Sequence, residues 1–472
     1  MKHNHSLRAF LLPFLGLTCA SLLWGQEKAE LHLNISQAGG KAQLTWNSIP
    51  DTSHYTLQAK PILDQAWMEV AGKLVESSFI LDLDEAHQFF RVLAHSAESP
   101  SIERGRLVSA EKVGEVSSLS LGFILLLLPG LPPEADRSVP YNVDLYKLTY
   151  ETIDPFGAPT FASAGVALPQ GLDEPLPIAS YQHPTVLQRT NVPSNPDSAE
   201  NLGGVFMAAG GFFTVMPDYL GLGDSEILHP FILAKPTATA SVDALRAAKL
   251  FAENQAVTTT EELFLLGYSE GGYATMSLHR EIESLHPEEF KVTASVPMAG
   301  PYDLSSTVRA EILSNQPLAQ PYQLPYLIAA LTQYQDVELT FADMLRGELA
   351  TAIPPLFNGM VSGAEINAQL PSLPFEILSD VAIEALEDTS HPLYLALQEN
   401  DVYAWQPNGR MRLYHCESDK VVSVGNSRTA LEYFQQFPNI EVELIDPGVE
   451  LDHEACAIPS IVAARQWINS IR

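Results

Sequence analysis

Hydrophobic and polar positions alternate in two different ways along the chain. Between about residues 30 and 95, apolar residues recur at every second position in short runs such as Leu31, Leu33 and Ile35, separated by turn-forming residues. This period of two predicts a small antiparallel β-sandwich. From Tyr141 onward, strand-like runs alternate with helix-like runs. That alternation predicts an α/β fold in which helices cover both faces of a mostly parallel sheet.

The α/β region contains eight candidate strands and four long candidate helices. The strands are expected at Val143–Thr152, Thr160–Leu168, Pro177–Tyr181, Phe212–Pro217, Leu263–Tyr268, Val292–Pro297, Met411–His415 and Ile440–Ile445. The helices are expected at Ser241–Asn254, Tyr273–Leu285, Ser427–Phe437 and Ile458–Ile471. No strand pattern occurs between Pro297 and Met411, so we expect a helical insertion over about residues 305–408 that covers the carboxyl edge of the sheet as a lid.

An apolar run near the N-terminus has the layout of a secretory signal peptide. Lys2 and Arg8 precede the run Ala9–Trp24, which ends in small residues, and this arrangement predicts a signal peptide over residues 1–25. The run is shorter than the roughly 20 apolar residues that a membrane-spanning helix needs. We therefore expect a secreted, periplasmic or cell-envelope protein without a stable transmembrane anchor.

A second apolar run, Leu119–Leu131, is also too short to span a membrane, and Pro129 and Gly130 break it. It is predicted to form a buried helix that packs on the main domain.

The charge balance excludes several classes of function. The chain carries 57 acidic and 26 basic side chains, so its formal net charge is −31. Such a charge repels phosphate backbones and anionic lipid, and we expect no nucleic-acid partner. No group of histidines and carboxylates has the spacing of metal ligands, and no glycine-rich phosphate loop occurs, so we expect no metal and no cofactor.

The chemistry is concentrated in the pentapeptide Gly267-Tyr-Ser-Glu-Gly271. It follows an apolar run and precedes a helical pattern, so Ser269 is expected on a sharp turn between a strand and a helix. Such a nucleophile elbow needs small neighbours, here Gly267 and Gly271, because its backbone is strained and crowded. The turn exposes the hydroxyl and directs the following amides toward a developing oxyanion. Ser269 is therefore the candidate nucleophile.

A serine hydroxyl needs a base, and after a nucleophile elbow the chain order is serine, acid, histidine. Of the histidines after Ser269, His453 alone lies in the expected loop between the final strand and the final helix. For the acid we select Asp419, which begins the turn after the seventh expected strand, with Glu417 and Asp303 as alternatives. Surface or packing roles are expected for His279, His286, His391 and His415.

Four motifs together resemble the α/β-hydrolase superfamily, and more closely its secretory lipases and their bacterial esterase relatives. They are Gly267-Tyr-Ser-Glu-Gly-Gly272, Met216-Pro-Asp-Tyr-Leu-Gly-Leu-Gly-Asp-Ser225, Ser180-Tyr-Gln-His-Pro-Thr185 and Leu451-Asp-His-Glu-Ala-Cys456. The resemblance covers about residues 105–472. It implies that Ser269, Asp419 and His453 cleave carboxylic esters through an acyl-enzyme, with the insertion as the lid.

One position departs from the family pattern. Relatives often have glycine where this chain has Pro184, and proline has no N–H with which to bind an oxyanion. We therefore expect the oxyanion hole to consist of the backbone N–H groups of Thr185 and Glu270. The segment 218–225 is expected to form a tight structural loop rather than to supply reacting groups.

Two cysteines flank the predicted acid and base. Cys416 stands three residues before Asp419, and Cys456 stands three residues after His453. If the acid and the base are partners, their loops touch and bring the two cysteines together. Export favours oxidation, and signal-peptide cleavage removes Cys19. The sequence therefore predicts a Cys416–Cys456 disulfide.

Residues 29–98 resemble the fibronectin type III-like modules of bacterial secreted enzymes, through Trp46, Tyr55, Trp67 and the sequence Phe89-Phe90-Arg91. The aromatic side chains are expected in the core of this module. Besides an ester or lipid substrate, the partner expected of the chain is a surface or a polymer that this module contacts.

The leading hypothesis from the sequence is an exported serine esterase or lipase. A secreted serine peptidase or an acyltransferase is an alternative, because the triad specifies neither the acyl group nor its acceptor. A surface-binding protein with an inert hydrolase domain is the alternative from a different class, and the complete order of serine, acid and histidine argues against it.

Overall fold

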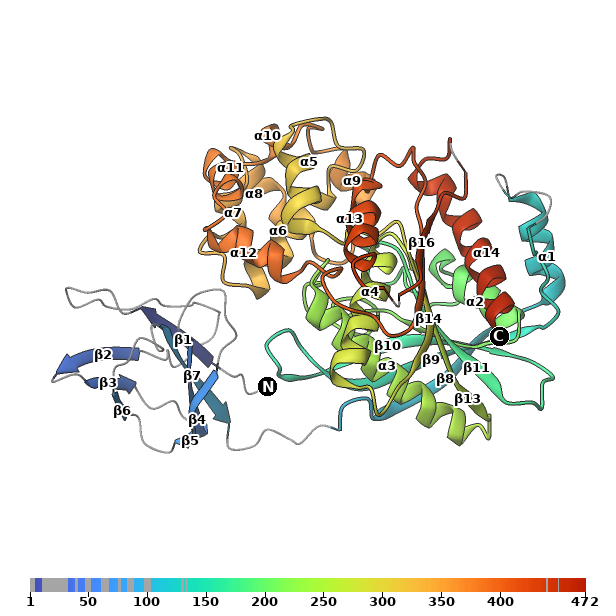
Figure 1. Cartoon of the computed structure of the whole chain (residues 1–472), viewed down its shortest axis with the longest axis horizontal. Helices are drawn as coiled ribbons and strands as arrows, with labels where there is room; N and C mark the ends of the chain where they lie inside the picture. Colours follow the sequence, from blue (N-terminus) through green and yellow to red (C-terminus); the bar gives the residue numbers. More distant parts are fainter. Residues whose placement is uncertain are drawn as a thin grey trace. The chain divides into compact units, whose positions relative to one another are not determined.

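The computed structural model describes residues 5–10, 33–38, 41–46, 52–60, 68–74, 78–82, 89–96, 103–128, 131, 135–438, 440–448 and 450–472. The chain divides into two compact units, Met1–Ser101 and Ile102–Arg472, each of which is visible in Figure 1. The two units are considered separately below.

The described residues of the first unit are strands of two antiparallel sheets. One sheet has the order β1 (His5–Phe10), β7 (Phe89–Ser96), β4 (Thr52–Lys60) and β5 (Met68–Leu74). The other has the order β2 (Leu33–Ala38), β3 (Lys41–Trp46) and β6 (Ser78–Asp82). The sandwich packing and the likeness to fibronectin type III stay predictions. So does the signal peptide: β1 lies within it and would be lost on cleavage, and the rest of the predicted apolar run lies outside the described residues.

The second unit is built on a nine-stranded sheet. Its order is β16 (Val442–Ile445), β15 (Arg410–Tyr414), β14 (Val292–Met298), β13 (Thr259–Tyr268), β11 (Leu176–Gln182), β12 (Phe213–Pro217), β10 (Pro159–Pro169), β9 (Val143–Ile153) and β8 (Leu107–Val116). Neighbours from β16 to β12 are parallel, whereas β10, β9 and β8 pair antiparallel. The predicted mostly parallel α/β sheet is confirmed. The edge strand β8 was not predicted, because it is largely exposed and lacks a buried apolar face.

Helices cover both faces of this sheet because successive residues of each strand point to opposite sides. In β13, Leu263 and Leu265 pack in one layer with α3 (Ala234–Asn254) and α4 (Glu270–Leu285). Phe264 and Leu266 pack in the other layer with α2 (Leu202–Ala209) and α14 (His453–Ile471). Burial on both faces explains the continuous apolar runs of the central strands.

Helix α14 begins at His453 and not near Ile458 as the sequence pattern indicated. The side chain of Asp452 accepts a hydrogen bond from the N–H of Ala455 and so caps the helix five residues earlier. His453 is therefore the first residue of α14. The prediction that it lies in the loop before the helix is wrong, because the helix begins about one turn earlier than expected.

A helical insertion separates β14 from β15, and its helices form one group in Figure 1, coloured yellow to orange. Its members are η2 (Leu304–Val308), α5 (Arg309–Leu313), α6 (Gln323–Tyr334), α7 (Phe341–Met344), α8 (Leu349–Ala352), η3 (Pro354–Leu356), α9 (Gly363–Asn367), α10 (Pro374–Ile377), α11 (Asp380–Glu387) and α12 (Pro392–Glu399). After it, α13 (Gly425–Phe434) connects β15 to β16. In the part of the chain that the structure describes, no helix is long and apolar enough to cross a membrane.

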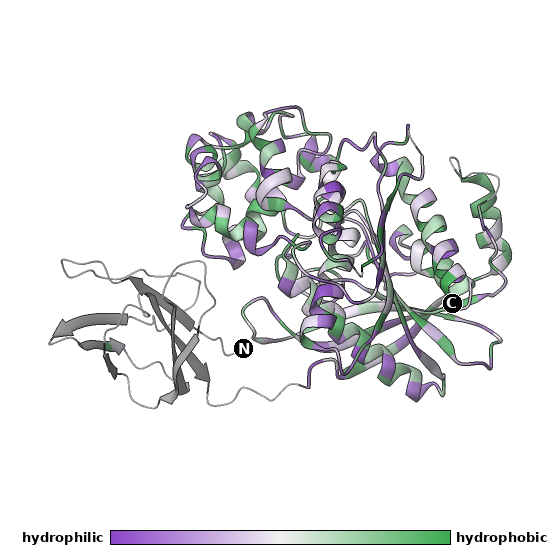
Figure 2. Ribbon diagram, in the orientation of Figure 1, coloured by the Kyte–Doolittle hydropathy of each residue, from purple (hydrophilic) through white to green (hydrophobic). Residues whose placement is uncertain are grey.

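The apolar run after β8 forms the helix α1 (Ser118–Leu127), which is only partly buried. Leu121 and Leu125, one turn apart, pack against the main domain. Leu119 and Leu126 are 83% and 69% exposed, and Figure 2 shows that α1 is hydrophobic along most of its length. The prediction of a buried helix is wrong for the face that carries Leu119 and Leu126. The neighbouring elements cover only the face that carries Leu121 and Leu125, which are four residues apart.

Candidate active site

Ser269 lies on a strained turn between β13 and α4. Its backbone has φ +60° and ψ −122°, a conformation that L-residues rarely adopt. A Cβ atom on Gly271 would collide with the carbonyl oxygen of Gln182, and one on Gly267 would collide with the carbonyl oxygen of Gly271. Only glycine therefore fits at both positions, which is the steric requirement expected of a nucleophile elbow.

The three predicted triad residues come together in the structure. The Oγ atom of Ser269 lies 2.9 Å from Nε2 of His453, and Nδ1 of His453 lies 2.6 Å from Oδ2 of Asp419. All three side chains are largely buried. Because a carboxylate only accepts, Nδ1 carries the proton of the neutral imidazole and Nε2 is free to accept the serine proton.

Asp419 is held as a carboxylate. Its Oδ1 accepts hydrogen bonds from the N–H groups of Val421 and Val422, each at 2.9 Å. Burial alone would raise its pKa, but hydrogen bonds from His415 and His453 outweigh burial and hold the pKa of Asp419 well below its usual range. Asp419 is therefore charged near neutral pH.

The two alternative acids are engaged elsewhere. Asp303 caps η2, where its oxygens accept hydrogen bonds from the backbone N–H groups of Ser306 and Thr307 at 3.2 and 3.1 Å. Glu417 forms an exposed ion pair with Arg428. Asp419 is thus the one acid of these three that the structure brings to His453.

Sequence reasoning missed one neighbour of the acid, His415, which was expected to be a packing residue. It is fully buried; its Nε2 donates to the carbonyl oxygen of Val422 at 2.8 Å and lies 3.3 Å from Oδ2 of Asp419. Its Nδ1 accepts from the hydroxyl of Ser427 at 2.8 Å. His415 stands four residues before Asp419 in the sequence. This spacing does not predict a contact unless the conformation of the turn between the two residues is known.

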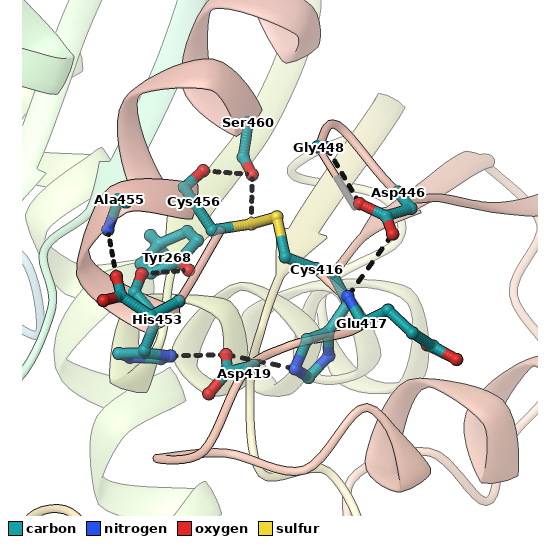
Figure 3. Close-up of a disulfide and its surroundings, with 12 residues drawn as sticks. Tyr268, Cys416, Glu417, Asp419, Asp446, Gly448, His453, Ala455, Cys456 and Ser460 are labelled. Carbon is teal, nitrogen blue, oxygen red and sulfur yellow. Dashed lines mark hydrogen bonds and ion pairs between the residues drawn. A yellow bond between two sulfur atoms is a disulfide. The ribbon is translucent and has the colours of Figure 1, made fainter. Parts of the chain in front are cut away.

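The predicted disulfide between Cys416 and Cys456 is present, with the two Cα atoms 6.1 Å apart (Figure 3). It joins the turn that carries Asp419 to the first turn of α14, which carries His453. Tyr268, the residue before Ser269, donates a hydrogen bond from its hydroxyl to the carbonyl oxygen of His453 at 2.6 Å. The acid loop, the base helix and the elbow are therefore connected to one another in addition to the triad contacts.

The loop that carries Thr185 lies against the first turn of α4. A Cβ atom on Gly271 would also come within 2.9 Å of the carbonyl oxygen of His183, which shows how closely the two segments approach. The N–H of Glu270 is the first of helix α4, and Glu270 follows Ser269 directly. These are the two segments from which the oxyanion-hole donors were predicted, and the roles of Thr185 and Glu270 stay predictions.

A cavity of about 260 Å³ lies between the sheet domain and the insertion. Arg189 and His229 line it from loops of the sheet domain, and Tyr326 of α6 and Phe357 line it from the insertion. Among the described residues, no group of three or more histidines, cysteines or carboxylates is arranged to hold a metal ion.

Comparison with known proteins places the chain in a family. A model of the secretory lipases matches residues 203–296. A protein from Legionella pneumophila classed as a hydrolase is 30% identical, with a TM-score of 0.70, over 78% of this chain and 98% of that one. The rice cell wall degrading esterase LipA from Xanthomonas oryzae is 26% identical, with a TM-score of 0.68, over 78% of this chain and all of that one. No curated protein matches the sequence.

A more distant structure, lipase A from Candida antarctica in its closed state, shares the fold. It is 16% identical, with a TM-score of 0.56, over 79% of this chain and 84% of that one. Fold, site and relatives together define a carboxylic-ester hydrolase. The chain belongs to the family of the Legionella hydrolase, within the esterases and lipases of the α/β-hydrolase fold. The match to the secretory lipases also suggests export.

Proposed function

We propose that the chain is an exported serine esterase or lipase that works through Ser269, His453 and Asp419. The observation that carries this proposal is the continuous hydrogen-bond chain from Ser269 Oγ to His453 to Asp419, at 2.9 and 2.6 Å. A buried carboxylate paired with Nδ1 stabilises the imidazolium that forms when Nε2 takes up a proton. This arrangement gives an otherwise weak nucleophile its base.

The reaction proceeds in two halves. Ser269 Oγ attacks the ester carbonyl as its proton passes to Nε2 of His453, and the N–H groups of Glu270 and Thr185 bind the oxyanion. The intermediate collapses, the C–O bond to the alcohol breaks, and His453 returns the proton to the leaving oxygen. Water then attacks the acyl-enzyme by the same route and releases the carboxylic acid and free Ser269.

The test is removal of the nucleophile. Ser269→Ala should lower kcat for a p-nitrophenyl ester by several orders of magnitude, because only binding and the oxyanion hole remain. A fluorophosphonate probe should label the wild type at Ser269 and leave the variant unlabelled. Near-normal turnover by a folded Ser269→Ala protein would show that the triad assignment is wrong.

We also propose that the insertion 305–408 is a lid that forms part of the acyl pocket. The cavity shared by Tyr326 and Phe357 with His229 supports this assignment. Phe357→Trp should fill the cavity and lower kcat/KM for medium-chain esters relative to short-chain esters. Phe161→Trp is the matched control, since Phe161 lies on β10 and is half exposed. An unchanged chain-length preference in Phe357→Trp would contradict the lid proposal.

A further inference from the structure

A buried histidine–glutamate pair adjoins the nucleophile. Nε2 of His229 lies 2.6 Å from Oε1 of Glu270, and the two side chains are only 2% and 1% exposed. Glu270 directly follows Ser269 and opens α4, whereas His229 lies in the loop between β12 and α3. The catalytic steps described above use neither side chain.

The hydrogen-bond geometry fixes the number of protons on this pair. Nδ1 of His229 lies 2.6 Å from the carbonyl oxygen of Leu220 and must carry a proton, because a carbonyl only accepts. Nε2 and Oε1 at 2.6 Å would repel each other if both presented lone pairs, so one further proton lies between them. Whether that proton sits on nitrogen or on oxygen, the pair has no net charge.

The pair reaches both sides of the proposed oxyanion hole. The ring of His229 lies 6.0 Å from the ring of Tyr219, which stacks on His183 at 4.3 Å. The hydroxyl of Tyr219 donates to the carbonyl oxygen of His183 at 3.1 Å, two residues before Thr185. Oε2 of Glu270 is buried without a hydrogen-bond partner. A negative charge on this carboxyl would therefore be poorly compensated.

The neighbouring histidine and the phenols around the pair do not supply a compensating charge near neutral pH. Burial lowers the pKa of His183 below its usual range and raises the pKa of Tyr322 to about 12. The pKa values of the other surrounding phenols are raised by burial as well, at Tyr219, Tyr273 and Tyr326. The charged side chains that line the same cavity as His229 are Arg189 and Glu226, which carry opposite charges.

We propose that His229 is a positioning residue for ester hydrolysis, which holds the Glu270 side chain in an uncharged pair so that the oxyanion does not face a buried negative charge. The proposal rests on the proposed function, because it takes the N–H of Glu270 as an oxyanion donor. Two negative charges near each other at a buried site repel strongly, and this repulsion would be felt mainly after the carbonyl oxygen becomes an oxyanion. Loss of His229 should therefore act on kcat more than on KM.

The experiment compares His229→Gln with the wild type on a p-nitrophenyl ester. The variant removes the partner that shares a proton with the Glu270 carboxyl, so its kcat should fall. We expect a loss of roughly 10- to 100-fold in kcat, less than the loss of a whole oxyanion donor, with KM changed by no more than about threefold. The double variant His229→Gln/Glu270→Gln, in which position 270 cannot carry a charge, should recover most of this loss.

The matched control is His279→Gln, which breaks another buried histidine–glutamate pair in the same helix. Nε2 of His279 lies 3.0 Å from Oε1 of Glu283, three turns beyond the elbow. This variant should lose stability without a comparable loss of kcat. The proposal is overturned if His229→Gln keeps the wild-type kcat, if KM rises as much as kcat falls, or if the double variant retains the loss.

A measurement on the wild type covers the case in which His229→Gln does not fold. In ¹H–¹⁵N spectra near neutral pH, Nδ1 of His229 should carry a proton, and Nε2 should share a second proton with the Glu270 carboxyl, as the two 2.6 Å contacts require. A pair that holds only one proton would overturn the proposal. The two proposals can fail separately. If Ser269→Ala is inactive and His229→Gln keeps the wild-type kcat, the positioning role of His229 is refuted and the triad assignment stands.

Discussion

At the residue scale, two buried aspartates show that hydrogen bonds decide whether burial favours or opposes charge. Asp419 accepts hydrogen bonds from two histidines, and they lower its pKa although burial opposes them. Asp218 accepts from the hydroxyl of Ser163 at 2.6 Å and from the N–H of Ser194 at 3.0 Å. At Asp218 these hydrogen bonds do not offset burial, which raises its pKa from 3.8 to about 6.

The raised pKa of Asp218 predicts how stability depends on pH. Between its unfolded value near 4 and about 6, the folded state binds more protons than the unfolded state, so the free energy of unfolding falls as the pH rises. The part due to Asp218 is at most about 3 kcal/mol and is fully lost above its folded pKa. Asp218→Asn removes this titration, so the stability of wild type relative to the variant should decline across the window. Urea unfolding at a series of pH values measures it, and a constant difference would contradict the assignment.

At the element scale, α1 offers two neighbouring leucines in opposite environments. Leu125 is 5% exposed and Leu126 is 69% exposed. Leu125→Ala should lower the free energy of unfolding by about 2–4 kcal/mol, and Leu126→Ala should change it by less than about 0.5 kcal/mol. Because both changes replace leucine by alanine in one helix, helix propensity cancels in the comparison. Equal losses in urea unfolding would show that the outer face of α1 is covered.

The disulfide links two elements that the triad also joins. It closes a loop of sequence separation 40, and the chain-entropy model assigns about 3–4 kcal/mol to such a closure. The double variant Cys416→Ser/Cys456→Ser should unfold at lower temperature and lose kcat, because Asp419 and His453 are then held by their hydrogen bonds alone. Dithiothreitol should shift the wild type toward the variant and leave the variant unchanged. Identical melting of the oxidised wild type and the variant would contradict the prediction.

At the scale of the whole molecule, the second unit contains a complete core of its own. The buried residues of its main apolar clusters lie between Leu121 and Ile468, and every residue of the candidate site belongs to the same unit. A protein that consists of residues 102–472 should therefore fold and hydrolyse a soluble p-nitrophenyl ester with kcat/KM within about twofold of the full chain.

The same truncated protein tests the predicted role of the first unit. If residues 29–98 contact a surface or a polymer, truncation should reduce binding to an insoluble ester-bearing substrate while activity on the soluble ester is kept. Loss of both activities would instead mean that the catalytic unit needs the first unit to fold. Equal binding by both proteins would contradict the predicted role.

What the sequence determined by itself is local. Continuous apolar runs located the strands of the parallel sheet, and the helical period located the helices between them, because each pattern reflects which faces of one element are buried. The glycines around Ser269 identified the elbow, because a crowded turn leaves no room for a Cβ atom. The order of Ser269, Asp419 and His453 could also be predicted, because each residue follows a recognisable strand.

The tertiary structure decided everything that depends on which distant segments meet. His229 and Glu270 are 41 residues apart, and nothing in either neighbourhood predicts their 2.6 Å contact. Leu121 and Leu126 are alike in sequence, yet one packs on the domain and the other faces outward, because only one side of α1 meets another element. Local periodicity records the tendency of a segment to bury one face, but burial and pairing themselves arise only when the whole chain has folded.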